Sequence, residues 1–219
     1  MTDVHVVRHD NARIYKDQLD QYFRARYEVC VRERGWARLA RPDGRDIDQF
    51  DTADAVHFLA INAGQVVGGI RLNPTTGPTL LNSVFPQLSV APLRGSPEVF
   101  EKSRLWVRKD KRGRASRPRI ESVLMAACVE FGLAVGLRAV RSVCEPFRVE
   151  RNRNLGWAPR LLGPPVEIEG LPCVAIEKDI SEAVWIRICV QEGVPGATLR
   201  WHGTPRPRYR LPELLSAVA

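Results

Sequence analysis

The segment Phe-Glu-Lys-Ser-Arg-Leu-Trp-Val at residues 100–107 carries a carboxylate and a hydroxyl two residues apart. Side chains alternate between the two faces of a β-strand, so Glu101 and Ser103 are predicted on one face, with Arg104 and Trp106 on the other. A strand holds such a pair rigidly, which suits the acceptance of a proton from a substrate. An edge strand with a solvated polar face would show the same pattern, so both interpretations stand on this segment alone.

Two other groups of charged residues could complete a site with these groups. Asp46, Asp48 and Asp51 lie in a long irregular connection, residues 36–52, that follows a predicted helix. Loops of this length in a compact domain are usually functional or disordered. Arg71 follows paired glycines in a predicted strand, where glycines indicate a bulge or the close approach of a ligand or another backbone.

A third charged segment, residues 108–119, contains Gly113 and many basic side chains and precedes a predicted helix. A strand, a basic glycine-containing loop and a helix N-terminus together attract phosphate. Acetyltransferase-like folds hold the pyrophosphate of coenzyme A in this way with the pattern Arg/Gln-x-x-Gly-x-Gly/Ala. Gly113 and Ala115 fit that pattern but Asp110 takes the basic position, so a merely solvated loop is the alternative.

The elements that would position these groups alternate between strands and helices. Helices are predicted at residues 12–34, 120–137, 147–155 and 181–190, and strands at 55–62, 65–72, 101–107, 138–145 and 173–179. This order favours a mixed sheet with helices on both faces. We expect one domain over residues 1–219, with a loosely ordered tail at about 194–219.

Composition narrows the class of protein. Of 219 residues, 44% are hydrophobic and 26% charged, as in an ordinary globular protein, and no apolar run has the length of a signal peptide or membrane span. We therefore expect a cytoplasmic protein without membrane contact. Five scattered cysteines and four histidines argue against disulfides, a metal centre or a Ser/His/Asp triad. The net charge of +8 indicates an anionic partner, which could be nucleic acid, a phosphorylated cofactor or an acidic carrier protein.

Several charged and aromatic positions recur in a distinctive order. They are Arg26 with Trp36, Asp48-Gln49-Phe50-Asp51, Arg71 in Gly-Gly-Ile-Arg-Leu-Asn-Pro, Glu101-Lys102-Ser103-Arg104, and Gly156-Trp157 before Leu162-Gly163-Pro164-Pro165. Over about residues 15–179 this set resembles the N-acyl-homoserine lactone synthases of bacterial quorum sensing. The segments at 41–45 and 74–86 look most like the branch that uses aryl- or branched-chain acyl-coenzyme A.

The resemblance implies an acetyltransferase-like (GNAT-like) α/β fold, an α-β-α sandwich with a mixed central sheet, forming a single autoinducer-synthase domain. It implies an acyltransferase with no bound cofactor or metal, whose substrates are S-adenosylmethionine and acyl-CoA or acyl carrier protein. The amine of S-adenosylmethionine would attack the thioester to give an amide. Its carboxylate would then close the lactone and expel 5′-methylthioadenosine.

The resemblance also implies roles for particular residues. Glu101 would act as the base through a water, with a carboxylate pKa raised by burial, and Ser103 would orient that water or the thioester. S-adenosylmethionine would be bound by Arg26, Trp36, Asp48, Asp51, Arg71 and Arg104. The acyl pocket is assigned to Cys30, Met125, Cys144 and Phe147. The phosphates of coenzyme A are assigned to Arg112, Arg114 and Arg117.

Two departures from the family pattern concern acyl specificity. Cys30 replaces an aromatic residue, which enlarges that wall of the site. Glu145-Pro146-Phe147-Arg148 stands where the coenzyme A branch carries consecutive tryptophans, which predicts a smaller or more polar pocket. Other functions remain open at this stage. The arginines and aspartates could be a structural ion-pair network, the enzyme could be a general N-acyltransferase on another amine, or residues 108–119 could bind nucleic acid. Aromatic residues are not interleaved with that basic run, which disfavours single-stranded nucleic acid.

Overall fold

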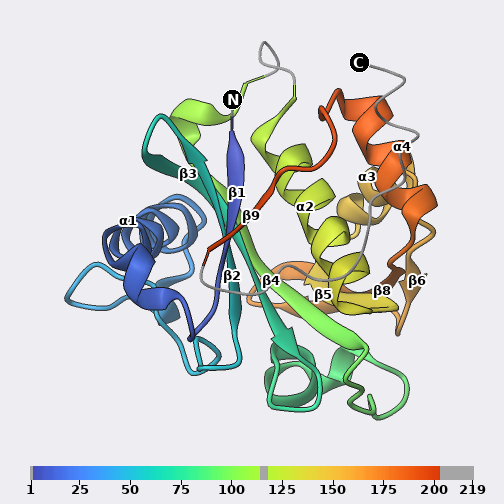
Figure 1. The fold of residues 1–219 in the computed structure, drawn as a ribbon. Coiled ribbons are helices and arrows are strands. Elements are labelled where there is room, and N and C mark those ends of the chain that lie inside the picture. The colour runs from blue at the N-terminus through green and yellow to red at the C-terminus, as the bar shows by residue number, and fades with distance from the viewer. Residues whose placement is uncertain (1, 114–117, 203–219) are drawn as a thin grey trace.

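The computed structural model describes residues 2–113 and 118–202, and within them one mixed sheet separates two layers of helices (Figure 1). The strand order is β6-β8-β5-β4-β3-β2-β1-β9, and β7 also pairs with β8. The strands are β1 (Asp3–Val7), β2 (Val56–Asn62), β3 (Gln65–Pro74), β4 (Val99–Val107), β5 (Ala139–Cys144), β6 (Arg160–Leu161), β7 (Val166–Ile168), β8 (Leu171–Asp179) and β9 (Leu199–Trp201).

The helices lie unequally on the two faces of the sheet. Helix α1 (Lys16–Tyr27) covers one face, flanked by a 3-10 turn at Ala12–Tyr15 and a π-helical turn at Glu28–Glu33. The other face carries α2 (Ile120–Val135), α3 (Phe147–Asn154) and α4 (Glu182–Glu192), as Figure 1 shows. This arrangement confirms the predicted α/β class with a mixed sheet between helices. In the described part of the chain, no helix is both long and apolar enough to cross a membrane.

The chain ends of the described region differ from expectation. β1 was not predicted, and β9 falls inside the segment expected to be a loose tail, yet it pairs in parallel with β1 through Val4 and Leu199. Leu199 is buried, and the Trp201 ring stacks on Phe131 of α2 with centroids 5.4 Å apart. Apolar contacts therefore order residues 199–201, while residues 203–219 lie outside the described residues.

A β-bulge in β4 changes which side chains share a face. Gly69 pairs with Trp106 and Arg71 with Ser103, so two steps along β3 face three along β4. The extra residue lies at Arg104, whose φ is +52°, a conformation that residues other than glycine rarely adopt. The predicted alternation is therefore wrong beyond Ser103, because the bulge turns Arg104 to the face of Glu101 and Ser103.

Packing on both faces agrees with this correction. Trp106 packs against Tyr22 of α1, whereas Leu105 and Val107 join the hydrophobic core under α2. Glu101, Ser103, Arg104 and Trp106 thus belong to the α1 face. A strict period of two would have placed Arg104 in the core under α2, where its charge would have no partner.

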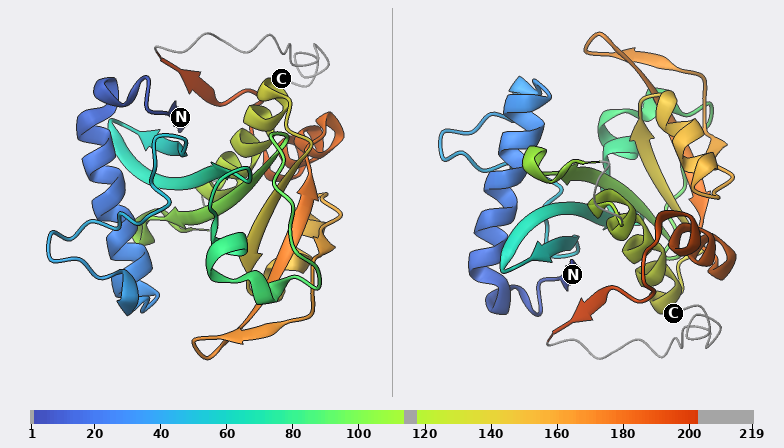
Figure 2. Two further views of the ribbon diagram at one scale, coloured as in Figure 1. Left: turned by 90° about the horizontal axis from the view of Figure 1, so that it is seen from below. Right: turned by 90° about the horizontal axis from the view of Figure 1, so that it is seen from above.

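β4 and β5 separate in the middle of the sheet. Their parallel pairing covers only Val99–Glu101 with Ala139–Arg141, although both strands continue, and Figure 2 shows them running apart. Lys102, Ser103 and Cys144, just beyond the last paired residues, are half-buried despite their central position. β4 is therefore unpaired with β5 from Lys102 onwards, directly after Glu101.

Candidate active site

Three arginines and three aspartates form a closed ring of ion pairs on the α1 face of the sheet. Every arginine bridges two aspartates and every aspartate bridges two arginines. In order around the ring, the closest N···O distances are Arg26–Asp51 2.6 Å, Asp51–Arg71 3.0 Å, Arg71–Asp48 2.5 Å, Asp48–Arg104 2.7 Å, Arg104–Asp46 3.0 Å and Asp46–Arg26 3.0 Å.

Separate elements bring the ring together. The arginines come from α1, β3 and the β4 bulge, and all three aspartates come from the connection before β2. Side chains of Arg26 and Arg71 are 0% exposed, whereas Arg104 and Asp48 at the opposite edge are 6% and 7% exposed. Charges buried this deeply persist only when paired, and the equal numbers leave the ring neutral. The edge at Arg104 and Asp48 is thus the part closest to solvent.

Trp36 lies beside this more open edge. Its ring is half-buried, with the Arg104 guanidinium carbon 5.5 Å from the ring centroid and that of Arg34 5.4 Å away. Arg34 also donates to the carbonyl oxygen of Leu105 in the unpaired part of β4, at 3.1 Å. An aromatic plane between two guanidinium groups therefore borders both the ring and the point where β4 and β5 part.

Ser103 and Glu101 border the ring along β4. The Ser103 hydroxyl accepts a hydrogen bond from Nε of Arg71 at 3.1 Å. Glu101 is 3% exposed, and its two carboxylate oxygens accept the backbone N–H groups of Leu80 and Leu81, each at 2.9 Å. Burial raises the pKa of Glu101, against the opposing effect of these hydrogen bonds and of Arg71. The predicted base is therefore buried, raised in pKa and already anchored to the turn at Leu80–Val84.

Asp51 of the ring and its neighbour His57 both have a lowered pKa. Although burial opposes ionisation of Asp51, the guanidinium groups of Arg26 and Arg71 hold its pKa well below the usual range. His57 lies 3.9 Å from Asp51, and burial lowers its pKa to about 3. His57 is therefore neutral at pH 7, and Asp51 stays charged over the physiological range.

Asp46 is the ring member that sequence reasoning placed in the loop but did not assign to the site. Its carboxylate accepts a hydrogen bond from Nε of Arg104 at 3.0 Å and forms an ion pair with Nε of Arg26 at 3.0 Å, and its backbone carbonyl accepts from Nη2 of Arg26. The signal that could have identified Asp46 was a count of charges, since three buried arginines require three carboxylates to balance them. Arg34 was likewise not assigned, because nothing in the sequence shows that a residue of the first helix reaches β4.

The four residues expected to form the acyl pocket do not lie together. Cys30 is fully buried near Arg34 and Arg104, and burial raises its thiol pKa. Met125 lies across the sheet on α2, with its sulfur 3.6 Å from Nζ of Lys102. Phe147 on α3 is 63% exposed, with the Arg148 guanidinium over its ring. The pocket assignment stays a prediction, with Met125 and Cys144 as its members nearest Lys102.

The basic segment after β4 is partly occupied by internal ion pairs. Arg112 pairs with Glu33 at 2.7 Å, and its Nε donates to the carbonyl of Val107 at 2.6 Å. Arg108 pairs with Asp110, the acidic residue at the basic position of the phosphate-binding pattern, at 3.1 Å. Arg114 and Arg117 lie outside the described residues. Binding of phosphate by Arg112 would therefore require its release from Glu33.

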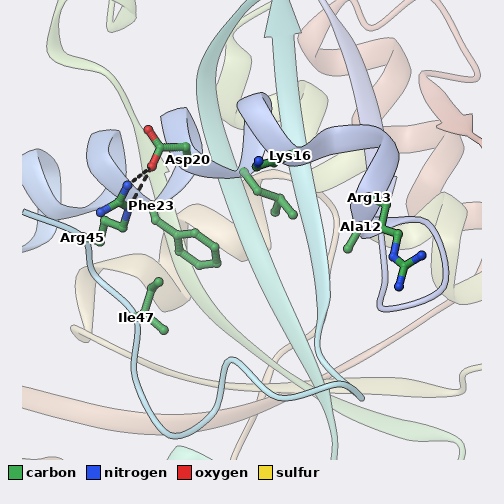
Figure 3. Close-up of a pocket in the computed structure, with 8 residues that line it drawn as sticks. Ala12, Arg13, Lys16, Asp20, Phe23, Arg45 and Ile47 are labelled. Atoms are coloured by element: carbon green, nitrogen blue, oxygen red, sulfur yellow. Dashed lines mark hydrogen bonds and ion pairs between the residues drawn. The ribbon is translucent and has the colours of Figure 1, made fainter. Parts of the chain in front are cut away.

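A shallow groove of about 490 Å³ lies on the outer side of α1 (Figure 3). Its lining is Ala12, Arg13, Lys16, Leu19, Asp20, Phe23, Arg45 and Ile47. None of these belongs to the ring, although the Arg26 guanidinium lies 5.1 Å from the Phe23 ring on the inner side. Asp20 and Arg45 pair across the groove, as Figure 3 shows. The groove lacks the titratable groups that the chemistry requires, so the ring and Glu101 remain the candidate site.

Comparison with known proteins agrees with this geometry. A family model described as autoinducer synthase matches residues 10–188. The isovaleryl-homoserine lactone synthase of Bradyrhizobium diazoefficiens is 38% identical over 180 residues, which cover 81% of this chain and 80% of that protein. An acyl-homoserine-lactone synthase of Ralstonia nicotianae is 34% identical over 180 residues, covering 80% and 86%.

Solved structures show the same relationship in three dimensions. The CoA-dependent acyl-homoserine lactone synthase BjaI, solved with SAM and isopentyl-CoA, has a TM-score of 0.88 at 33% identity and covers 94% of this chain and 95% of that one. The CoA-dependent synthase MesI has a TM-score of 0.83 at 33% identity, covering 90% and 98%. An acyl-CoA N-acyltransferase from Pseudomonas aeruginosa, at 16% identity and a TM-score of 0.56, shares the fold alone. The chain belongs to the autoinducer synthase family of acyltransferases, as its charged residues predicted.

Proposed function

We propose that this enzyme transfers an acyl group from acyl-CoA to the amine of S-adenosylmethionine and closes the product to an acyl-homoserine lactone. The amine nitrogen attacks the thioester carbonyl, the amide forms, and the thiol of coenzyme A leaves. The carboxylate of the S-adenosylmethionine moiety then attacks its own carbon next to the sulfonium. That bond breaks, 5′-methylthioadenosine leaves, and the lactone remains.

The closed ring is the observation that carries this proposal. Its more open edge presents the Asp48 carboxylate and the Arg104 guanidinium next to the Trp36 ring. S-adenosylmethionine carries a carboxylate, an amine, a sulfonium and an aromatic base, so these three groups match its charges and its ring. Asp51, Arg26 and Arg71 are buried behind that edge, and their proposed part is to fix the position of Asp48 and Arg104.

Glu101 supplies the base in this scheme. The amine of S-adenosylmethionine is protonated at neutral pH and cannot attack until it loses a proton. Each Glu101 oxygen accepts one backbone N–H and the Thr79 side chain also hydrogen-bonds the carboxylate, so of its about four lone-pair sites one is left for a bridging water. The raised pKa of Glu101 brings its basicity closer to that of the amine. Ser103, held by Arg71, is suited to orient the thioester or this water.

Acyl-CoA is the donor we favour over acyl carrier protein. The named relatives BjaI and MesI are CoA-dependent, and their structures match this chain over most of its length. We place the thioester arm where β4 and β5 part, because this point lies next to Glu101. Of the aryl and short branched acyl groups that the sequence predicts, we favour the short branched one, by similarity to the isovaleryl-homoserine lactone synthase.

The test is incubation of the purified protein with S-adenosylmethionine and a panel of acyl-CoA and acyl-carrier donors, followed by mass spectrometry. We expect an acyl-homoserine lactone and 5′-methylthioadenosine in equal amounts, together with free coenzyme A. An acylated amine without release of 5′-methylthioadenosine would instead indicate a general N-acyltransferase. Saturable, steeply salt-dependent binding to polyanions without turnover would favour the nucleic-acid function.

A further inference from the structure

Two lysine side chains meet in the interior on the α2 face of the sheet. Lys178 of β8 is 1% exposed; its Nζ lies 3.1 Å from Oδ1 of Asn152 and 4.3 Å from the centroid of the Trp157 ring. Burial and the nearby charge of Lys102 lower the pKa of Lys178 well below its ordinary value. Burial also lowers the pKa of Lys102, whose Nζ contacts the Met125 sulfur at 3.6 Å. Two amines therefore share one largely apolar space.

Nearby carboxylates are engaged elsewhere. Glu121 pairs with Arg151 at 2.7 Å and with Arg148 at 3.7 Å, and Glu145 pairs with Arg148 at 2.9 Å. Within residues 2–113 and 118–202, neither lysine has a carboxylate oxygen within the 4.0 Å of an ion pair. Buried ammonium groups are normally paired, so the pair of lysines is an unusual feature of this core.

The position of Lys102 connects this feature to the acyl group. Lys102 lies between Glu101 and Ser103 in sequence but points to the opposite face, where β4 has left β5. As a whole residue Lys102 is half-buried, whereas Lys178 is buried. Met125 and Cys144, which the family resemblance assigns to the acyl pocket, both neighbour it. An acyl chain entering between β4 and β5 would meet an amine there.

We propose that Lys102, backed by Lys178, selects an acyl chain that carries a hydrogen-bond-accepting oxygen at its distal end. This inference rests on the proposed function. Lys102 would be a specificity-determining residue, since its Nζ has hydrogens to donate, and its neighbours are the weakly accepting Met125 sulfur and the Lys178 amine rather than an oxygen. A plain hydrocarbon chain would leave these donors unpaired, whereas a hydroxyl or carboxylate oxygen would accept them. A site built to bind a polar group rejects the analogue that lacks it.

The test compares donors of equal length that differ only at the distal carbon. Butyryl-CoA, 4-hydroxybutyryl-CoA and succinyl-CoA form a four-carbon set, and hexanoyl-, 6-hydroxyhexanoyl- and adipyl-CoA a six-carbon set. We expect the wild type to prefer an oxygenated member in kcat/KM by at least about tenfold, which corresponds to about 1.4 kcal/mol. Preference for the carboxylate would indicate an anionic acyl group, and preference for the hydroxyl a neutral one.

Lys102→Met and Lys178→Met serve as the variants, with exposed Lys16→Met on α1 as the control. The preference is the ratio of the kcat/KM values of two donors measured with the same protein. A general loss of activity in a variant therefore cancels from this ratio. We expect Lys102→Met to abolish the preference, Lys178→Met to weaken it, and Lys16→Met to keep it. A wild type that prefers the hydrocarbons, or a Lys102→Met variant with unchanged preference, overturns this proposal while leaving the synthase function intact. Absence of S-adenosylmethionine uptake by calorimetry, with no turnover of any donor, overturns both.

Discussion

The carboxylate of Glu101 accepts the backbone N–H of Leu81 at 2.9 Å, while its other oxygen accepts the N–H of Leu80. These two amides begin the turn at Leu80–Val84, for which Thr79 also supplies a capping box with Asn82. Amides at the start of a helical turn have no partner within the turn, so the carboxylate satisfies them. The proposed base is therefore also the anchor of the segment over this end of the sheet.

Replacement of Glu101 by Gln should lower kcat/KM by orders of magnitude, because an amide cannot take the amine proton. Glu101 must be ionised to act, so wild-type kcat/KM should fall as pH drops through its raised pKa. The pH profile of kcat/KM for Glu101→Gln, measured from pH 5 to 9, should lack this decrease at low pH. Hydrogen exchange at the Leu80 and Leu81 amides distinguishes the structural role of Glu101 from its role as a base. Faster exchange in Glu101→Gln with unchanged turnover would leave Glu101 only the structural role. Exposed Glu98→Gln is the control.

Loss of one carboxylate from the ring should destabilise the fold. Asp46→Asn leaves Arg26 and Arg104 each with a single aspartate in a buried setting, and breaking a buried pair costs about 3–5 kcal/mol. We expect a matching decrease in the free energy of unfolding by urea denaturation. Asp43→Asn is the matched control in the same loop, because Asp43 is 53% exposed and pairs only on the surface with Arg45. Equal effects of the two substitutions would contradict the ring as a stabilising unit.

Gly69 should tolerate no side chain. A Cβ there would lie 2.3 Å from Cε2 of Tyr22 and 2.8 Å from the Phe58 carbonyl oxygen. Tyr22 is fully buried between α1 and the sheet, so it cannot move aside cheaply. Gly69→Ala should lower the unfolding free energy by about 1–3 kcal/mol. At Gly77 a Cβ would lie 4.0 Å from the Pro74 carbonyl oxygen, and Gly77→Ala should be close to neutral. Thermal melts of the two variants give the comparison.

Glu130 should make stability depend on pH. It accepts the backbone N–H of Thr198 at 2.9 Å, and burial raises its pKa from 4.5 to about 7. Between these two values the folded state binds a proton that the unfolded state has lost. The free energy of unfolding therefore falls as pH rises from about 4.5 to 7, by on the order of 3 kcal/mol from this group.

Glu130→Gln removes that titration but keeps an oxygen for the Thr198 amide. The variant should melt at a higher temperature than wild type at pH 8, and the difference should shrink towards pH 4.5. Exposed Glu150→Gln, on the surface of α3, should leave the profile unchanged. A parallel pH profile for Glu130→Gln and wild type would show that Glu130 is not the titrating group.

Much of the candidate site could be predicted from the sequence, because the sequence alone gives the types of the residues and their order along the chain. Glu101, Ser103, Asp48, Asp51 and the three arginines were all assigned to one site, and the structure brings them together. Ser181 begins the predicted last helix, and its hydroxyl caps the helix by accepting the N–H of Val184. Such local signals depend on a few neighbouring residues, so a single chain is enough to show them.

Other features depended on pairing between distant segments. A bulge cannot be read from β4 alone, because it is a mismatch in length between two paired strands, so the alternation failed at Arg104. Likewise, Leu199–Trp201 forms a strand because it pairs with the edge strand β1 and because Trp201 stacks on Phe131.

By itself, then, the sequence determined the fold class and the set of charged groups, since periodicity and residue type are properties of one chain segment. Only the tertiary structure decided that Asp46 closes the ring, that Glu101 holds the amides of Leu80 and Leu81, and that Lys102 and Lys178 share one space. The physical reason is that charge pairing and burial are properties of groups from different segments. They exist only once the sheet has set strands from across the chain side by side.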